Sequence, residues 1–277
     1  MVTELSVSFD RVNDVLIQDQ ADFSLDDKVY VKAPLNVSFN NVSFKYREQE
    51  EKFALKDISF DIKAGSFIGI VGRNGSGKTT LVKLLSKLYE NYMGEINLNN
   101  SELRTVMPNQ LRTAISVVPQ EVFLFNGTIK ENILYGNSNA TNEEVIEAAI
   151  AANLHTFVQN LYLGYNTMIG DSGSNMSGGQ RLKIALARLL VSKPEIIILD
   201  EASSALDVET EKKVMENIRK KFKDKTIISI AHRINTLRNA DKILVLDEGK
   251  LIEQGNHNDL IKHKGLYNEF INTFLNF

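Results

Sequence analysis

The octapeptide Gly72-Arg73-Asn74-Gly75-Ser76-Gly77-Lys78-Thr79 constrains this 277-residue chain more than any other segment. It follows the apolar run Phe67–Val71, which is typical of a buried strand, and it leads into Thr79–Leu88, where leucines recur at helical spacing. Glycines let successive backbone N–H groups turn toward an anion, and the first turn of a helix adds its positive pole. The order of strand, loop and helix therefore predicts a phosphate-binding loop rather than an ordinary glycine-rich turn.

The polar side chains of this loop have separate expected roles. The octapeptide matches the Walker A pattern G-x-x-x-x-G-K-[ST], in which Lys78 would reach the terminal phosphates of a nucleotide and Thr79 would offer a hydroxyl to Mg²⁺. The residues expected to contact the nucleotide here are Gly72, Asn74, Gly75, Ser76, Gly77, Lys78, Thr79 and Thr80.

Two acids follow a second apolar run. Ile196–Leu199 is typical of a buried strand, and Asp200 and Glu201 come directly after it, at the end where α/β sheets form their ligand crevice. Asp200 is expected to bind Mg²⁺, and Glu201 to orient and activate the water that attacks the γ-phosphate. A pair of solvated acids is the alternative, which the phosphate-binding loop makes less favourable.

Ser177-Gly178-Gly179-Gln180 is expected to open a helix. A capping serine and two glycines leave several N–H groups accessible at the helix N-terminus, so the segment predicts a second anion site. Two chains meeting head to tail could then bind one nucleotide between this segment and the phosphate-binding loop. The alternative is a capped helix with a purely structural role.

The composition excludes several classes of protein. Hydrophobic residues make up 43% and charged residues 24% of the chain, which is typical of a globular protein. The formal net charge of −3 weighs against nucleic-acid binding as the main task. The absence of cysteine excludes disulfides, thiolate metal sites and a cysteine nucleophile. Ala148–Gly170, the longest stretch without charged residues, is too polar to span a membrane, and the N-terminus does not resemble a secretory signal.

The chain divides into a linker and one large domain. Residues 1–36 are expected to form the linker, in which Phe9–Leu16 has the spacing of a short amphipathic helix. Residues 37–277 form the domain, which contains a helical insert at about 121–183 with a capping box at Thr141. Its front is expected to be β-rich, with one strand face formed by Val42, Phe44 and Tyr46. A parallel sheet is indicated by the apolar runs Ile196–Leu199, Ile227–Ile230 and Ile243–Leu246.

Asn175-Met176-Ser177-Gly178-Gly179-Gln180 resembles the signature motif of the ATP-binding cassette (ABC) ATPases. As in that family, it lies between the phosphate-binding loop and the acidic pair. Met176 stands where leucine is usual, a volume-conserving exchange that should cost little. The resemblance covers about Val37–Phe277, and it implies that Ser177, Gly178 and Gly179 bind ATP held by another subunit.

Other motifs of the family occur in the expected order. Tyr46 resembles the aromatic residue that stacks on adenine, and Gln120 resembles the glutamine that touches Mg²⁺ and relays to the membrane domain. Ser204-Ala205-Leu206-Asp207 resembles the D-loop. His232 resembles the switch histidine, which contacts the γ-phosphate and links it to the D-loop of the opposite subunit. Taken singly, these residues could equally be a strand residue, a loop residue and a packed histidine.

The subtype resembles an exporter. Leu124–Ile133 and Ile169–Gly173 are similar to segments of exporter cassettes, and residues 1–36 resemble the stretch that joins the last membrane helix to the cassette. Asp171 stands where exporters typically have glutamate, in the segment that touches the partner's coupling helix. The implied cargo is a peptide or a bacteriocin, and drug and lipid exporters are the alternative.

The resemblance implies an α/β fold with a RecA-like P-loop NTPase core, an antiparallel β subdomain and an inserted helical signature subdomain. It implies an Mg²⁺-dependent ATPase in which Glu201, His232 and Lys78 are catalytic, Thr79, Gln120 and Asp200 bind the metal, and Tyr46 and Asp207 complete the ATP site. The implied partners are a second copy in an ATP-dependent homodimer, or a related chain in a heterodimer, and a transmembrane domain at the cytoplasmic face of the cell membrane. No nucleic acid is expected.

Two rival classes remain. A soluble ABC ATPase of DNA repair or of the ribosome would favour two cassettes, a coiled-coil insertion or a basic surface. The residues upstream of Met1 or the neighbouring gene distinguish this class, because an exporter needs about six spans of roughly 20 apolar residues each. A P-loop kinase would leave Ser177–Gln180 and His232 unexplained.

Overall fold

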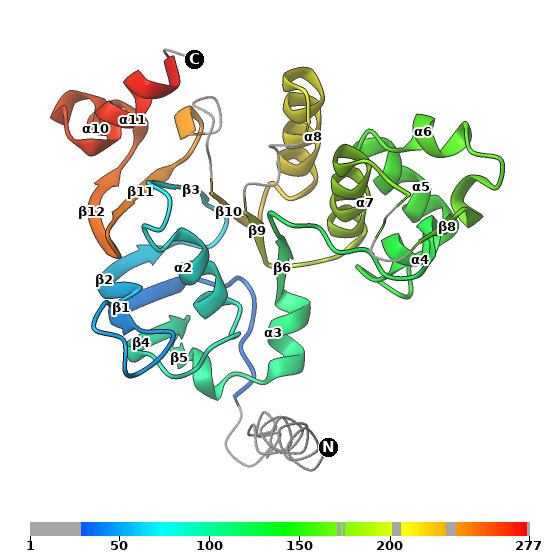
Figure 1. The fold of residues 1–277 in the computed structure, drawn as a ribbon. Helices are drawn as coiled ribbons and strands as arrows, with labels where there is room; N and C mark the ends of the chain where they lie inside the picture. Colours follow the sequence, from blue (N-terminus) through cyan, green and yellow to red (C-terminus); the bar gives the residue numbers. More distant parts are fainter. Residues whose placement is uncertain (1–28, 171–172, 174, 201–205, 231–236, 276–277) are drawn as a thin grey trace, which may run out of the picture.

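The computed structural model describes residues 29–170, 173, 175–200, 206–230 and 237–275, with side chains described up to residue 272 (Figure 1). The amphipathic helix predicted at Phe9–Leu16 lies outside the described residues. None of the helices in the described part of the chain is long and apolar enough to cross a membrane.

A six-stranded sheet forms the centre of the fold. Its strand order is β12-β11-β3-β10-β9-β6, in which β12 is antiparallel to β11 and the other neighbours are parallel. The predicted parallel α/β core is therefore confirmed. Its strands are β3 (Phe67–Gly72), β6 (Ile115–Val118), β9 (Ile196–Asp200), β10 (Thr226–Ile230), β11 (Lys242–Asp247) and β12 (Lys250–Gly255).

The inner strands β3, β9 and β10 of the central sheet are buried on both faces because their residues alternate between two hydrophobic cores. In β9, Ile196 and Ile198 belong to the core shared with the β-rich lobe, whereas Ile197 and Leu199 belong to the core shared with the helical lobe. Continuous apolar strands are characteristic of such two-sided burial. All five parallel strands end at the same edge, so the residues that follow them lie close together.

The predicted antiparallel β subdomain is confirmed as a second sheet with the order β2-β1-β4-β5. It is built from β1 (Val37–Phe44), β2 (Leu55–Ile62), β4 (Met93–Leu98) and β5 (Ser101–Glu102). The prediction that Val42, Phe44 and Tyr46 form one strand face was wrong. The pairing of β1 with β2 shifts register on either side of Val42, and β1 ends at Phe44, so Tyr46 follows the strand.

The helical lobe lies to one side of β6 and β9, away from β1, β2 and β4 (Figure 1). The capping box predicted at Thr141 is present at the start of α5, and a second one opens α7 at Ser177. The proposed helical subdomain ends at about residue 183, and this limit lies inside α7, which continues to Val191. The lobe contains α4 (Ile129–Leu134), α5 (Asn142–Ala151), α6 (His155–Gln159), η2 (Gly164–Asn166), α7 (Gly178–Val191) and the short strands β7 (Gly127–Thr128) and β8 (Met168–Ile169).

The other helices connect strands or follow the last one. α2 (Lys78–Leu85) buries Leu81, Leu84 and Leu85 in the core shared with the β-rich lobe. The remaining helices are η1 (Leu103–Thr105), α3 (Pro108–Ala114), α8 (Val208–Lys221), α10 (His257–His263) and α11 (Leu266–Leu275).

Candidate functional site

The phosphate-binding loop runs from the end of β3 to the start of α2. Gly72 is level with Leu246 of the neighbouring strand β11, and a Cβ at Gly72 would lie 2.2 Å from the Leu246 carbonyl oxygen. Gly77 is the N-cap residue of α2 and has a φ of 102°, in the left-handed region that favours glycine. The loop can therefore pass close to the neighbouring strand and enter α2 in this conformation only because these positions lack side chains.

Replacing Gly77 with alanine should damage the loop more than the same change at Gly75. Both have positive φ, 102° and 77°, but a Cβ at Gly77 would lie 2.6 Å from Leu55 Cδ2 and 2.8 Å from the Ala54 oxygen, while one at Gly75 meets nothing within 4 Å. We expect Gly77→Ala to lower the free energy of unfolding by about 2 kcal/mol and to weaken ATP binding about tenfold, against about 1 kcal/mol for Gly75→Ala. Urea unfolding and calorimetric titration with ATP measure both effects, and equal losses in the two variants would contradict the steric argument.

Lys78 is turned back over the loop that precedes it. Its side chain is 6% exposed, and Nζ donates to the carbonyl oxygens of Gly72 and Arg73 at 2.9 and 3.0 Å. Ser76 Oγ is buried nearby and has no hydrogen-bond partner among the described residues. The ammonium is therefore held at the centre of the loop, where it can exchange a carbonyl for a phosphate oxygen with little movement.

A cleft of about 450 Å³ opens in front of this loop. Nine of its ten lining residues were predicted from the sequence to contact the nucleotide, and the tenth is Ala54. Ala54 belongs to none of the sequence motifs, and its backbone lies close to Gly77 and Gly249 just before β2. The lining residues are Tyr46, Ala54, Asn74, Gly75, Ser76, Gly77, Lys78, Thr79, Thr80 and Gln120.

Tyr46 is a fixed aromatic wall of the cleft. Its ring packs edge-on against Phe44 and Tyr89, with centroids 5.1 and 5.4 Å away, and its hydroxyl lies 2.9 Å from Thr80 Oγ1. The Lys83 ammonium lies 5.4 Å from the ring centroid, and 38% of the Tyr46 surface remains exposed. An exposed, pre-positioned ring is what stacking on a base requires.

Asp200 and Gln120 lie at the same edge of the sheet as the loop. Asp200 pairs with Ile230, which in turn pairs with Ile70 on β3, and Gln120 follows β6 by two residues. The Asp200 side chain is 5% exposed, while Gln120 and Thr79 line the cleft.

The oxygen atoms of Thr79, Gln120 and Asp200 suit Mg²⁺ that also binds phosphate oxygens, rather than a metal ion bound by protein side chains alone. Mg²⁺ is usually bound through one or two carboxylates together with phosphate oxygens and water. No group of three or more His, Cys, Asp or Glu residues within the described part of the chain could hold a metal by itself. Thr79, Gln120 and Asp200 therefore fit a metal ion that arrives with a phosphate.

The signature segment lies outside this cleft, in the helical lobe. Ser177 caps α7 through a reciprocal pair of bonds: its Oγ accepts from Gln180 N at 3.2 Å, and its own N donates to Gln180 Oε1 at 2.8 Å. Ser177 and Gly178 are exposed. Within one chain, the two predicted anion sites are thus formed separately, one in each lobe.

Asp207 is also away from the cleft, at the N-cap of α8. Its carboxylate accepts a hydrogen bond from Thr210 N at 2.9 Å, and this bond holds the pKa of Asp207 below its ordinary value. Asp207 is therefore ionised at neutral pH. The predicted catalytic residues Glu201 and His232 lie outside the described residues, as do Asp171, Ser204 and Ala205.

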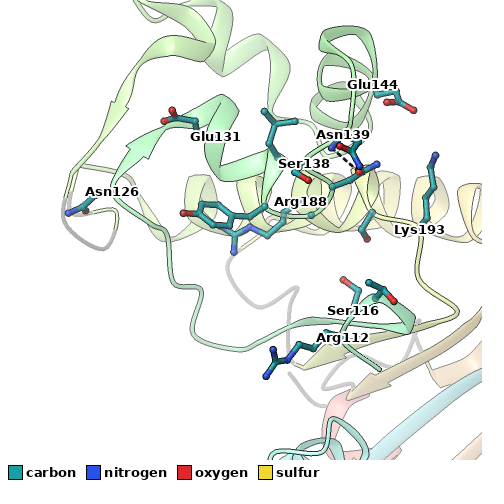
Figure 2. A pocket seen from close by; sticks show the side chains of 15 residues that line it. Arg112, Ser116, Asn126, Glu131, Ser138, Asn139, Glu144, Arg188 and Lys193 are labelled. Carbon is teal, nitrogen blue, oxygen red and sulfur yellow. Dashed lines mark hydrogen bonds between the residues drawn. The ribbon is translucent and has the colours of Figure 1, made fainter. Parts of the chain in front are cut away.

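A larger groove of about 1150 Å³ separates the helical lobe from α3 and β6, and its lining was not predicted from the sequence. Figure 2 shows Arg188 of α7 between Arg112 and Ser116 on one side and Glu131, Ser138 and Asn139 on the other. Glu131 is engaged in the capping box of α4 with Thr128. The groove therefore presents a cation, Arg188, near its middle.

Arg188 is held by a buried asparagine. Its Nε donates to the Asn132 carbonyl oxygen at 3.0 Å and its Nη2 to Asn132 Oδ1 at 3.2 Å, while the Asn132 amide also bonds the backbone of Phe125 and Thr128. Burial lowers the pKa of Arg188, and none of the ion pairs between described residues includes it. The sequence offers one indication of this contact: Asn132 is a polar residue among the buried Ile129 and Ile133 of α4.

Comparisons with known proteins agree on one family. The family model described as "ABC transporter" matches residues 55–204. The chain is 46% identical over 232 residues to the leukotoxin export ATP-binding protein LtxB of Aggregatibacter actinomycetemcomitans, covering 83% of this chain and 33% of LtxB. It is 42% identical over 269 residues to the leukotoxin translocation ATP-binding protein LktB of Mannheimia haemolytica, covering 95% of this chain and 37% of LktB.

A solved structure gives the same result. A bacterial Atm1-family ABC exporter with ATP bound is similar with a TM-score of 0.86 and 40% sequence identity, covering 90% of this chain and 43% of that chain. The chain thus spans between a third and about two-fifths of the length of these relatives.

Proposed function

The chain belongs to the ABC transporter family, and from that premise we propose that it is the ATP-binding and ATP-hydrolysing domain of an exporter, working as a pair of such domains. The observation that carries this proposal is the cleft formed by Tyr46, the phosphate-binding loop and Gln120, which combines an aromatic wall, a glycine-rich loop at a helix N-terminus and a buried ammonium. The signature segment, which one chain keeps apart from this cleft, supports the pairing. In a homodimer, or in a heterodimer with a related chain, each ATP would lie between the cleft of one subunit and Ser177, Gly178 and Gly179 of the other.

In this proposal each group of the cleft has one task. Lys78 moves from the carbonyls of Gly72 and Arg73 to the terminal phosphates, and Tyr46 stacks on the adenine. Thr79, Gln120 and Asp200 would hold Mg²⁺, which neutralises charge on the phosphate oxygens when it is bound.

Hydrolysis and its release involve residues at the ends of β9 and β10. Glu201 accepts a proton from the attacking water, and His232 contacts the γ-phosphate while linking it to the D-loop of the other subunit, which ends at Asp207. Loss of the γ-phosphate removes the contacts that join the two subunits, so the pair opens. A cycle of closing and opening is then the mechanical output of the domain.

The proposed pairing predicts that ATP hydrolysis depends on chain concentration. Because a complete site needs residues from two chains, the turnover rate per chain should rise with concentration and then saturate, while ATP binding to a single chain should not change. Steady-state phosphate release over a thousandfold range of chain concentration measures this, with light scattering to record the mass of the species. A constant rate per chain from a species that scatters as a monomer would contradict the proposal.

We further propose that this domain serves a membrane domain at the cytoplasmic face of the cell membrane. The support is that LtxB and LktB are named for leukotoxin export and translocation and are much longer than this chain. The groove around Arg188 shares no lining residue with the ATP cleft, so a segment of the membrane domain could occupy it without blocking the nucleotide. A peptide or bacteriocin is the proposed cargo, with drugs or lipids as the alternative.

A further inference from the structure

The start of α7 is held by one of its own side chains. Arg181 lies one turn inside the helix, and its guanidinium folds back over the N-terminus. Nη1 donates to the carbonyl oxygen of Met176 at 2.8 Å and to that of Gly173 at 3.4 Å. These two carbonyls belong to the loop that leads into Ser177, so the helix and the loop before it are joined by a charged donor.

The loop is shaped to receive this side chain. Gly173 has a φ of 76°, and a Cβ there would lie 2.9 Å from Arg181 Cδ and 3.1 Å from Leu124 Cδ1. Met176 N donates to the Gly173 carbonyl at 2.9 Å, which closes a tight turn under the guanidinium. The arginine stem therefore packs against a position that only glycine leaves open.

A second side chain fixes the same loop from its other end. Asn175 Oδ1 accepts from Gly170 N at 3.1 Å, and Asn175 Nδ2 donates to the Met168 carbonyl at 3.0 Å. Asn175 thus ties the loop to β8, while Arg181 ties it to α7. Ser177 lies between these two anchors in the sequence.

The charge of Arg181 is unusual for its place. A cation near a helix N-terminus opposes the helix dipole, and α7 has no acidic residue in its first turn to offset it. A Cβ built at Gly178 would lie 4.0 Å from Arg181 Nη2, so the positive charge lies beside the first turn of the helix. This arrangement is unfavourable for an isolated helix but favourable when an anion lies in front of it.

We propose that Arg181 is the positioning residue of the signature half of the ATP site. It fixes the carbonyls of Gly173 and Met176 so that Ser177, Gly178 and Gly179 face the phosphates of ATP held by a second copy of this chain, and its charge adds to theirs. The inference rests on the proposed function, because it requires that ATP be bound between two chains.

The test compares Arg181→Ala and Arg181→Lys in a chain that also carries Glu201→Gln. ATP-driven dimerisation is followed by light scattering, and ATP binding to the cleft of the single chain is followed by calorimetry at a concentration below dimerisation. We expect Arg181→Ala to weaken ATP-driven dimerisation about tenfold or more, with cleft affinity changed less than about twofold. Arg181→Lys should recover part of the loss, because lysine keeps the positive charge and its donors but lacks the planar guanidinium that fits this loop. Lys220→Ala, which removes one positive charge from the exposed end of α8, is the control.

A second readout separates positioning from folding. In the chain with Glu201 intact, Arg181→Ala should raise the chain concentration needed for half-maximal hydrolysis while leaving the limiting rate within about twofold. If the Arg181→Ala variant does not fold, the Arg181→Lys variant tests the inference instead. We expect it to weaken ATP-driven dimerisation about threefold. Failure of the Glu201→Gln parent to dimerise with ATP would instead overturn the proposed function. A parent that dimerises together with Arg181 variants that dimerise equally well would overturn this inference alone.

Discussion

Replacing Glu201 with glutamine should leave ATP binding intact, reduce turnover about 10²-fold to 10⁴-fold and trap an ATP-dependent dimer. Glutamine keeps the shape of the side chain but cannot accept a proton from water at neutral pH. Glu201 directly follows Asp200, whose side chain is buried at the edge of the sheet where the cleft opens.

Two measurements test this expectation together. Phosphate release gives the turnover rate, and light scattering with and without ATP and Mg²⁺ gives the mass of the complex. Glu209→Gln is a matched control, because Glu209 is exposed and forms a surface ion pair of 2.8 Å with Lys213 on the same helix. Unchanged turnover would remove Glu201 from the role of essential base. A persistent monomer that binds ATP would mean that assembly needs the membrane domain or that the signature helix does not act on a second chain.

Local patterns could be predicted well from the sequence. The phosphate-binding loop needs only consecutive residues: a buried strand, glycines at two positive φ positions, and a lysine at the start of a helix. The capping boxes at Thr141 and Ser177 are equally local, since each is closed by a residue three positions later. The parallel sheet could be predicted because strands buried on both faces must be continuously apolar.

Features that depend on distant contacts could not be predicted in the same way. The end of β1 at Phe44 follows from irregular pairing with β2, which no alternation of residues reveals. Arg188 lies 56 residues from Asn132, so their bonds leave no short-range pattern. Ala54 lines the cleft because its backbone packs close to Gly77, which lies 23 residues later in the chain. In each case the information lies in the packing of separate segments.

The two predicted anion sites also differ in how completely a single chain forms them. The loop around Lys78 is complete within one chain, with its ammonium already placed over Gly72 and Arg73. The signature segment is shaped within one chain by Ser177, Asn175 and Arg181, but it is not among the residues that line the cleft. Nucleotide affinity of the single chain should therefore depend on the first site, and assembly on the second.

Replacing Lys78 with alanine should weaken ATP binding about 100-fold or more and abolish hydrolysis. A charged hydrogen bond to an anion contributes about 1.5–3 kcal/mol, and Lys78 would make more than one such contact with the terminal phosphates. The effect on folding should be small, about 1 kcal/mol, because the ammonium is desolvated in the free loop and its loss removes that cost as well as two hydrogen bonds to carbonyls.

Calorimetric titration with ATP and with ADP in the presence of Mg²⁺ separates the two contributions of Lys78. ATP carries the γ-phosphate that ADP lacks, so the loss of affinity in Lys78→Ala should be greater for ATP. Lys63→Ala removes an exposed lysine that follows β2, outside the residues lining the cleft, and should change ATP affinity less than about twofold. If Lys78→Ala bound ATP as tightly as this control, the glycine-rich loop would not be the nucleotide site, and both the cleft and the pairing built on it would have to be abandoned.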